Sequence, residues 1–230
     1  MIGPLAQKIK QELEEKLEAR TISFLTRDFT LPGIKQAQGH LNPLTLTMRR
    51  VGEIFTSMNF SLYEGPEVDT DFYNFTSLNV PEDHPARDMQ DTFFIEDGRV
   101  LRTQTSNMQV RLMQEQKPPL RVGVIGRVYR SEATDARHAH TFHQVEAFAV
   151  DRDIRLANLQ CFIRDVLSRF FDRDVEIRLR PGYFPFVEPG MEVDCTCLCG
   201  GKKKNCPLCK GSGWLEMGGC GMIHPNVFKA

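Results

Sequence analysis

The densest group of side chains that could do chemistry lies in residues 126–146, which read GRVYRSEATDARHAHTFHQVE. The group lies at the end of one expected strand, in a loop and on the return strand, and consists of Arg130, Glu132, His138, Phe142 and Glu146. A guanidinium can bind phosphate oxygens through two hydrogen bonds. A carboxylate such as Glu132 can accept from an exocyclic amine, and a purine can stack on the ring of Phe142. Each residue alone also has an ordinary structural explanation, so the joint spacing carries the signal.

Alternation along three expected strands points to one chemically loaded sheet face, because alternate residues of a strand share a side. The strands are 102–106, 142–150 and 184–188. Their shared faces hold Arg102, Gln104 and Ser106; Phe142, Gln144, Glu146, Phe148 and Val150; and Phe184, Phe186 and Glu188. A core face is normally aliphatic, since buried polar groups cost free energy unless they are paired. If these strands are neighbours, the mixed aromatic and polar face favours a concave small-molecule site.

A mixture of helices and strands must position these residues. Helices are expected at 4–20, where Leu5, Ile9, Leu13 and Leu17 form a narrow apolar stripe, and at 44–58 and 154–172. Residues 28–43 resemble a linker. Strand-like runs separated by turns fill Phe60 to Val150, including 92–95, 99–104, 121–130 and 141–150, and a pair follows at 174–180 and 183–188. This order predicts an α+β domain with an antiparallel sheet flanked by helices.

Composition excludes several protein classes. The 230 residues are 41% hydrophobic and 26% charged, which does not fit a disordered tail, a collagen-like fibre or a coiled-coil rod. With 29 basic and 30 acidic side chains, the net charge of −1 excludes nucleic-acid binding by bulk charge alone. We expect no membrane span, since no apolar run approaches about 18 residues. Without a signal peptide, clustered cysteines indicate a metal site in a reducing compartment, and the cytoplasm is expected.

The cysteine cluster lies in residues 194–214, DCTCLCGGKKKNCPLCKGSGW, which we interpret as a small zinc-ribbon-like insert. Cys206 and Cys209 have the spacing of a zinc knuckle. The first half offers Cys195, Cys197 and Cys199, so either Cys197 and Cys199 or Cys195 and Cys199 would complete the four ligands. The alternatives are reduced thiols in a loop and a chaperone-like zinc module. A catalytic zinc is not expected, because no His or carboxylate accompanies the thiols.

The motifs resemble a known enzyme family. Tyr129-Arg130-Ser131-Glu132, followed by His138, Phe142 and Glu146, resembles motif 2 of class II aminoacyl-tRNA synthetases. Over residues 38–230 the chain is similar to the bacterial phenylalanyl-tRNA synthetase alpha subunit. The matching segments are GPEVDTDFYNF (65–75), HPARDMQD (84–91), LRTQTS (101–106), GRVYR (126–130), FHQVE (142–146), YFPFVEP (183–189) and GCGMIHPN (219–226).

The resemblance implies a phenylalanine–tRNA ligase that uses ATP and Mg²⁺, acts on L-phenylalanine and tRNA(Phe), and assembles with a beta subunit as α2β2. It implies that Arg130 holds the α-phosphate, Glu132 the adenine amine and His138 the distal phosphates, while Phe142 stacks on adenine. The residues implied to orient the amino acid are Gln104, Ser106, Gln109, Gln144 and Glu146. Phe184 and Phe186 would meet the substrate ring, and Glu188 would share a structural Mg²⁺ with the beta subunit.

The chain also departs from the family pattern. Asn42 stands where the family usually has His, and Ala147 where it usually has Gly. The Gly-rich third motif ending in Glu-Arg is not found, so we expect a catalytic domain over 38–230 truncated before that motif. Residues 1–37 would be an N-terminal helix and linker left from a tRNA-binding coiled-coil arm. The alternative function is a non-catalytic, synthetase-derived binding module or inactive fragment.

Overall fold

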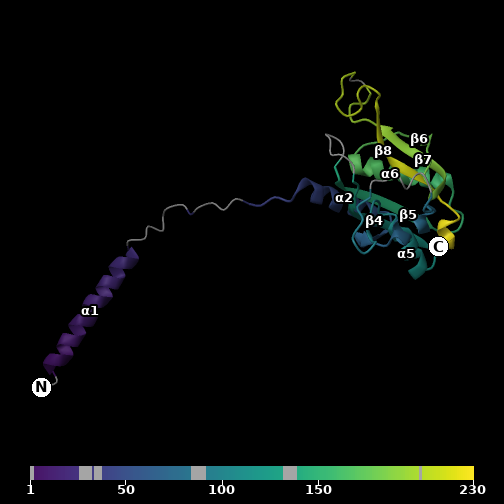
Figure 1. Cartoon of the computed structure of the whole chain (residues 1–230). Coiled ribbons are helices and arrows are strands. Elements are labelled where there is room, and N and C mark those ends of the chain that lie inside the picture. The colour runs from purple at the N-terminus through teal and green to yellow at the C-terminus, as the bar shows by residue number, and fades with distance from the viewer. Residues whose placement is uncertain (1–2, 26–32, 34–37, 84–91, 132–138, 202–203) are drawn as a thin grey trace. The chain divides into compact units, whose positions relative to one another are not determined.

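The computed structural model describes residues 3–25, 33, 38–83, 92–131, 139–201 and 204–230. It divides into two compact units, Met1–Leu41 and Asn42–Ala230, which are described separately. Figure 1 shows the elements of both units. Among the described helices, none is long and apolar enough to cross a membrane.

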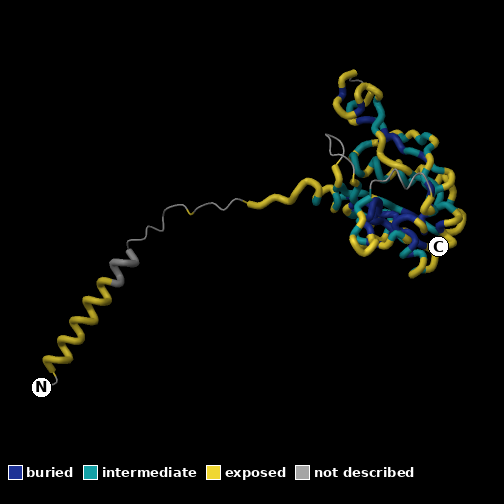
Figure 2. The backbone as a smooth tube through the Cα atoms, viewed as in Figure 1, coloured by how far each residue is buried: buried dark blue, intermediate teal, exposed yellow. Residues whose placement is uncertain are grey.

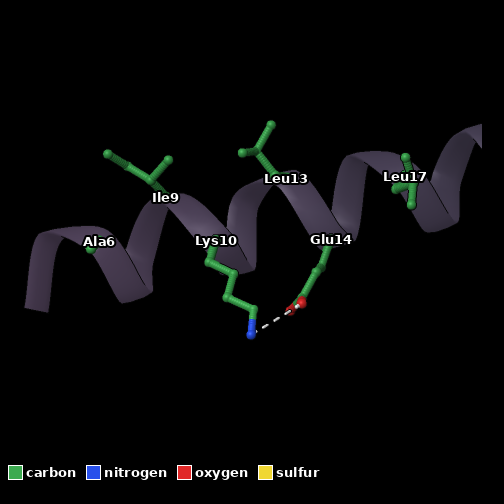
Figure 3. A pocket seen from close by; sticks show the side chains of 6 residues that line it. All are labelled: Ala6, Ile9, Lys10, Leu13, Glu14 and Leu17. Carbon is green, nitrogen blue, oxygen red and sulfur yellow. Dashed lines mark ion pairs between the residues drawn. The ribbon is translucent and has the colours of Figure 1, made fainter. Parts of the chain in front are cut away.

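The first unit contains the helix α1 (Gly3–Leu25), which is longer than the predicted 4–20. The expected apolar stripe is exposed, with Leu5 at 63%, Leu13 at 61% and Leu17 at 69% exposure. Figure 3 shows the stripe beside the ion pair between Lys10 Nζ and Glu14, whose atoms lie 3.8 Å apart. The open hollow along this face, about 510 Å³, is lined by one helix and mainly by hydrocarbon, so it lacks the convergent polar groups of a ligand site.

The centre of the second unit is a hairpin of two ten-residue strands, β4 (Leu120–Tyr129) and β5 (Thr141–Val150). They pair antiparallel, from Leu120 opposite Val150 to Tyr129 opposite Thr141. The short strand β1 (Ser61–Tyr63) joins the other edge of β4 in parallel. Both long strands lie where the sequence predicts them, at 121–130 and 141–150. The sheet is antiparallel, as expected, except at β1.

Helices cover both faces of this sheet. On one face, Val122, Val124 and Phe148 form a buried cluster with residues of α5 (Asn107–Glu115). On the other, a side chain at Gly123 would start 2.4 Å from the Phe55 ring of α2 (Pro43–Ser57), so glycine is needed for the helix to approach. The side chain of Asn42 caps α2 by accepting from Leu44 N at 2.9 Å, a normal role for an amide at that position. Figure 2 shows the buried core beside β4.

A second antiparallel sheet has the order β6 (Ile177–Pro181), β7 (Val187–Thr196) and β8 (Trp214–Ile223). It follows α6 (Leu156–Phe171), which confirms the helix expected at 154–172. Ile223, at the end of β8, packs against the buried clusters of both α5 faces and so ties this sheet to the core. The smaller elements are β2 (Val68–Asp69), α3 (Asp71–Asn74), η1 (Thr76–Leu78), β3 (Val100–Leu101) and η2 (Val227–Lys229).

Several predictions of secondary structure are wrong, among them the strand at 92–95, where the structure has only an isolated bridge between Phe94 and Val100. Residues 102–106 form a turn into α5 and not a strand, because their polar side chains bond to Asn74 and Glu146 and not along a strand ladder. The helix α5 itself was not expected, since the whole stretch from Phe60 to Val150 was interpreted as strands and turns. Phe184 and Phe186 lie in the turn before β7, so strand alternation does not place them.

Candidate active site and metal site

A half-buried carboxylate on β5 is the centre of the candidate active site. Glu146 accepts hydrogen bonds from Thr105 Oγ1 at 3.0 Å, Ser106 Oγ at 2.6 Å and Gln109 Nε2 at 2.6 Å. The donors come from the turn before α5 and from its first turn, while β5 supplies the acceptor. The structure therefore brings three of the expected residues together and adds Thr105, which the sequence analysis missed although it directly precedes Ser106.

Two opposing effects of the environment act on the pKa of Glu146. Burial raises the pKa of this carboxyl, and the hydrogen bonds from Gln109, Ser106 and Thr105 oppose that shift because they stabilise the ionised form. A carboxylate has about four acceptor positions, and three are used here, so one remains for a further donor. An ammonium group is the donor that benefits most from such a site.

The other two amides expected near this carboxylate behave differently. Gln104 is buried and its Nε2 donates to Asn74 O at 3.3 Å, so it is engaged with the chain that packs beside the turn. Gln144 is half-buried on the same face of β5 as Glu146, opposite Gly126 of β4. Gln144 thus keeps the position the sequence predicts, whereas Gln104 does not reach Glu146 among the hydrogen bonds found.

Arg130 immediately follows β4, and its backbone N donates to His140 O at 3.0 Å across the end of the hairpin. Its guanidinium carbon lies 5.1 Å from the centroid of the Phe142 ring, within cation–π distance. Its Nε is buried and has no hydrogen-bond partner among the described residues. A buried, unpaired N–H of a cation is suited to an anionic ligand. Glu132 and His138, the other residues expected here, lie outside the described residues.

The two phenylalanines predicted to contact a substrate ring lie in the turn before β7. Phe184 and Phe186 are half-buried, with ring centroids 6.2 Å apart and planes inclined at 40°. Phe186 packs against the cluster that contains Val110 of α5, the residue next to Gln109. The helix therefore connects the aromatic pair with the carboxylate site. Glu188, expected to bind Mg²⁺, is exposed near the start of β7.

A buried arginine, Arg102, positions this region; the sequence analysis placed it on the polar strand face but assigned it no role. Arg102 is 2% exposed, and donates from Nε to Arg127 O at 2.7 Å and from Nη1 to Gly65 O at 3.0 Å. A side chain at Gly126 would start 2.1 Å from Arg102 Nη2, so the glycine of the GRVYR segment makes room for the guanidinium. Burial lowers the pKa of Arg102, and the acidic groups of Glu67 and Asp69 oppose this.

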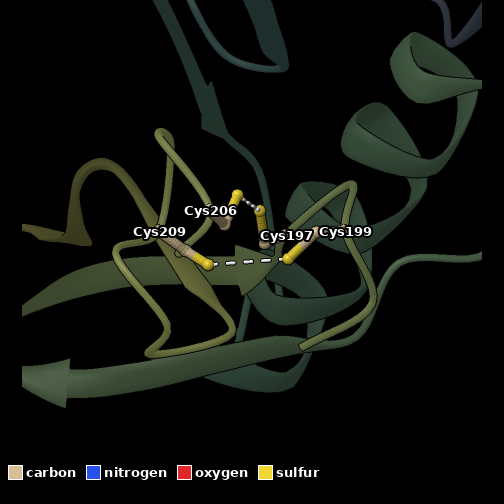
Figure 4. Close-up of side chains that lie close together, drawn as sticks. All are labelled: Cys197, Cys199, Cys206 and Cys209. Carbon is tan, nitrogen blue, oxygen red and sulfur yellow. Dashed lines mark hydrogen bonds between the residues drawn. The ribbon is translucent and has the colours of Figure 1, made fainter. Parts of the chain in front are cut away.

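Four thiols converge at the tip of the β7–β8 hairpin (Figure 4). The Sγ atoms of Cys197, Cys199, Cys206 and Cys209 all lie within 4.8 Å of one another. The Sγ distances are 3.8 Å for Cys197–Cys206 and 3.6 Å for Cys199–Cys209. Four thiolates about 2.3 Å from a tetrahedral Zn²⁺ would be about 3.8 Å apart, so the donor set and its spacing fit that ion.

The backbone of the insert is folded around these sulfurs. Gly200 N donates to Cys197 O and Lys210 N donates to Cys206 O, both at 2.8 Å, so each half of the insert makes a turn around its cysteines. Gly200 has a φ of 64° and Gly201 of 72°, conformations that glycine adopts without strain. Cys195 is not part of the group: it lies on β7 opposite Leu215, and burial raises the pKa of its thiol.

The thiols influence one another strongly. Burial raises the pKa of Cys199, but hydrogen bonds from Cys197 and Cys209 and from the backbone at Gly201 outweigh this effect and lower the pKa to about 6. A thiolate is the form that binds metal. The first thiolate of the cluster is therefore available near neutral pH.

Comparison with known proteins agrees with this geometry. Residues 26–230 match the class II core domain of tRNA synthetases. The chain is 49% identical to the phenylalanine–tRNA ligase alpha subunit of Methylococcus capsulatus, over 98% of this chain and 66% of that protein. It is 44% identical to the alpha subunit of Clostridium novyi and 46% identical to that of Pseudomonas savastanoi, covering 70% of each. The chain thus spans about two thirds of the length of these relatives.

Among solved structures, two of pyrrolysyl-tRNA synthetase from Desulfitobacterium hafniense share the fold, at 20% identity. Their TM-scores are 0.54 and 0.55, and they cover 82% and 84% of this chain and 64% and 66% of theirs. The fold expected from motif 2 is therefore confirmed. The chain belongs to the family of phenylalanine–tRNA ligase alpha subunits, and residues 26–230 match the class II core domain of tRNA synthetases.

Proposed function

We propose that the chain activates L-phenylalanine with ATP and serves its transfer to tRNA(Phe), as the names of its relatives indicate. The observation that supports this most is the single face of β5, which carries the ring of Phe142 near Arg130 and, four residues on, the carboxylate of Glu146. A site for a phosphorylated base and a site for an ammonium group therefore lie along one strand.

ATP would bind at the end of the β4–β5 hairpin. The Arg130 guanidinium, with its unpaired Nε, would donate to the α-phosphate, and Phe142 would stack on adenine. We assign the adenine amine to Glu132 and the distal phosphates to His138 on the basis of the family motif. Mg²⁺ bound with ATP would neutralise phosphate charge during the reaction.

Phenylalanine would bind between the carboxylate site and the aromatic pair. Its ammonium would take the remaining acceptor position of Glu146, with Gln144, Ser106 and Gln109 fixing that group and Gln104 supporting the turn from behind. Its ring would lie against Phe184 and Phe186, where an edge-to-face contact contributes about 0.5–1.5 kcal/mol beyond burial. The amino acid is thus held at both ends, which leaves its carboxylate directed to the phosphate.

The chemistry needs no nucleophilic side chain. The amino-acid carboxylate attacks the α-phosphorus of ATP, a new acyl–phosphate bond forms, and pyrophosphate leaves. A ribose hydroxyl of the tRNA then attacks the acyl carbonyl, loses its proton and displaces AMP. The protein contributes by positioning the two reactants and by stabilising charge at phosphorus through Arg130.

A beta subunit in an α2β2 assembly, tRNA(Phe) and a cytoplasmic location follow from the same proposal, since the relatives are named as alpha subunits of a translation enzyme. Exposed Glu188 is suited to a Mg²⁺ shared with such a partner, because an exposed carboxylate can be ligated from a second chain. We further assign a structural Zn²⁺ to Cys197, Cys199, Cys206 and Cys209, since the set is closed and all-thiolate.

The test is phenylalanine-dependent exchange of pyrophosphate into ATP, measured on the alpha subunit assembled with its beta subunit. Exchange that requires phenylalanine and is lost in Arg130→Ala supports the proposal. A folded complex that binds phenylalanine but supports no exchange would instead indicate the non-catalytic binding module.

A further inference from the structure

The ring of Phe184 lies on a surface made by three glycines. Cβ atoms built at Gly182 and Gly190 would lie 3.3 Å from Phe184 Cε2 and 3.4 Å from Phe184 Cδ2. A Cβ at Gly219 would lie only 2.6 Å from Phe184 Cζ and 2.9 Å from Cε2. A methyl group at Gly219 therefore cannot coexist with the Phe184 ring where it is, whereas a Cβ at Gly182 or Gly190 would be close to ordinary contact with that ring and would meet Glu192 Cγ at 3.0 Å or Gly182 O at 2.6 Å instead.

Space, and not backbone conformation, is what requires glycine at this position. Gly219 is not among the glycines with positive φ, so its backbone suits any L-residue. Its neighbour Gly218 has a φ of 149°, and there the conformation itself favours glycine. The atoms of Phe184 are the three nearest to a Cβ at Gly219.

Two of the three glycines, Gly190 and Gly219, lie on one face of the β7–β8 hairpin, and Gly182 directly follows β6. Gly219 pairs with Glu192, and Gly190 pairs with Gly221, so these positions share a side of the two strands. Met191 and Val193, on the opposite side of β7, are buried in the core. Phe184 is half-buried, and its ring lies against the backbone at Gly219.

We infer that Gly219 fixes the position of the Phe184 ring and thereby sets the depth of the pocket that receives the substrate side chain. This inference rests on the proposed role of Phe184 in phenylalanine binding. A side chain at 219 would push the ring off β8 and into the space the substrate ring needs. Gly219 is thus a positioning residue that acts on specificity through Phe184.

The test is Gly219→Ala in the assembled enzyme, with the dissociation constants of L-phenylalanine and ATP measured separately by calorimetry. We expect phenylalanine to bind about tenfold more weakly, equivalent to ~1.4 kcal/mol, and ATP affinity to be unchanged. Replacing Phe184 by Leu removes the ring atoms that clash, so Gly219→Ala should cost less phenylalanine affinity in the Phe184→Leu background than in the wild-type background, a partial rescue. A merely structural role of Gly219 would not produce this rescue.

Gly52→Ala is the matched control. Gly52 lies on α2, away from the pocket, and a Cβ there would lie 3.0 Å from Leu62 Cδ1 of β1. Unchanged phenylalanine affinity in folded Gly219→Ala overturns the inference, as does a Gly219→Ala variant that fails to fold both with and without Phe184→Leu. A wild-type complex that binds no phenylalanine overturns the proposed function itself. The two failures are therefore distinguishable.

Discussion

Ser106 Oγ donates to Glu146 Oε2 over 2.6 Å, although the residues are 40 positions apart in sequence. Ser106 is the N-cap residue of α5, where serine usually accepts from a backbone N–H of the first turn. Here the side chain makes no such cap and turns to the carboxylate instead. The helix thus forgoes a cap worth about 1 kcal/mol, and the hydroxyl orients Glu146.

Ser106→Ala should weaken phenylalanine binding and shift its pH dependence upward. The ammonium of the substrate needs ionised Glu146, and the Ser106 hydrogen bond lowers the pKa that burial raises. Without it the carboxyl protonates at a higher pH, so affinity is lost earlier on acidification. A hydrogen bond to a charged group is worth about 1.5–3 kcal/mol, and calorimetric titrations over a pH series check both effects. Ser106→Thr keeps the hydroxyl and is the control; equal midpoints in Ala and wild type would contradict the assignment.

Glu146→Gln should abolish phenylalanine binding yet stabilise the ligand-free protein at neutral pH. Because folding raises the pKa of Glu146, its contribution to stability is present below the unfolded pKa and lost as pH rises through the folded pKa. A neutral amide avoids that loss. Thermal unfolding should show a gain over wild type that grows from acidic to neutral pH. A variant that is less stable than wild type at neutral pH would be evidence against a destabilised carboxylate.

Arg130→Ala should reduce ATP–pyrophosphate exchange by about 10²–10³, the usual cost of removing a group that stabilises transition-state charge. Its stability should change by no more than about 1 kcal/mol, since the Nε has no described partner and the lost contact is one cation–π pair. Arg121→Ala, near the start of β4, is the control, because its guanidinium is 3.9 Å from Asp151 and half-exposed. Equal exchange rates in the two variants would remove Arg130 from the site.

The long strands with regular alternation were predictable from the sequence. The positions of side chains in turns were not. The strands β4 and β5 alternate over ten residues each, so parity correctly placed Phe142, Gln144 and Glu146 on one face. The same rule failed at Gln104 and Ser106, because a turn and a helix start have no two-residue period. The Ser106 hydroxyl and the Gln109 amide both reach Glu146 because the two residues are three positions apart at the start of α5, a helical spacing. The sequence analysis expected no helix there.

The cysteine spacing predicted five candidate zinc ligands, one more than a tetrahedral site needs, and could not identify the cysteine that is not a ligand. Cys195 lies within β7, whereas Cys197 directly follows the last residue of that strand. Because β7 runs to Thr196, Cys195 faces the sheet interior while Cys197 already lies in the insert. Strand ends depend on tertiary pairing, here with Leu215 and Trp214 of β8, and are not encoded by the local spacing.

Cys206→Ser should remove tightly bound zinc, whereas Cys195→Ser should retain about one zinc per chain. The first change deletes one of four convergent sulfurs, and the second alters a thiol outside the cluster. Elemental analysis of the purified complexes measures this directly. Trp214, the only tryptophan, begins β8 beside the insert, so its fluorescence should change on chelation in the Cys195 variant as in wild type. Equal zinc loss from both variants would disprove the assigned ligand set.

Asp194→Asn should destabilise the β6–β7–β8 sheet by about 1.5–3 kcal/mol, the range for hydrogen bonds to charged groups. Asp194 is 2% exposed and accepts two bonds from Arg180, at 2.7 and 3.0 Å, and two from Arg178, at 2.7 and 3.0 Å. The Arg180 hydrogen bonds lower the pKa of Asp194, so this stability is present above the unfolded pKa and is lost as pH falls through the folded one. Denaturant unfolding should therefore show a difference between variant and wild type at neutral pH that disappears in acid. Glu216→Gln is the control, since Glu216 is 67% exposed and 3.5 Å from Arg180, where an ion pair contributes little. A difference that persisted unchanged into acid would show that packing of Asp194, and not its charge, holds the sheet.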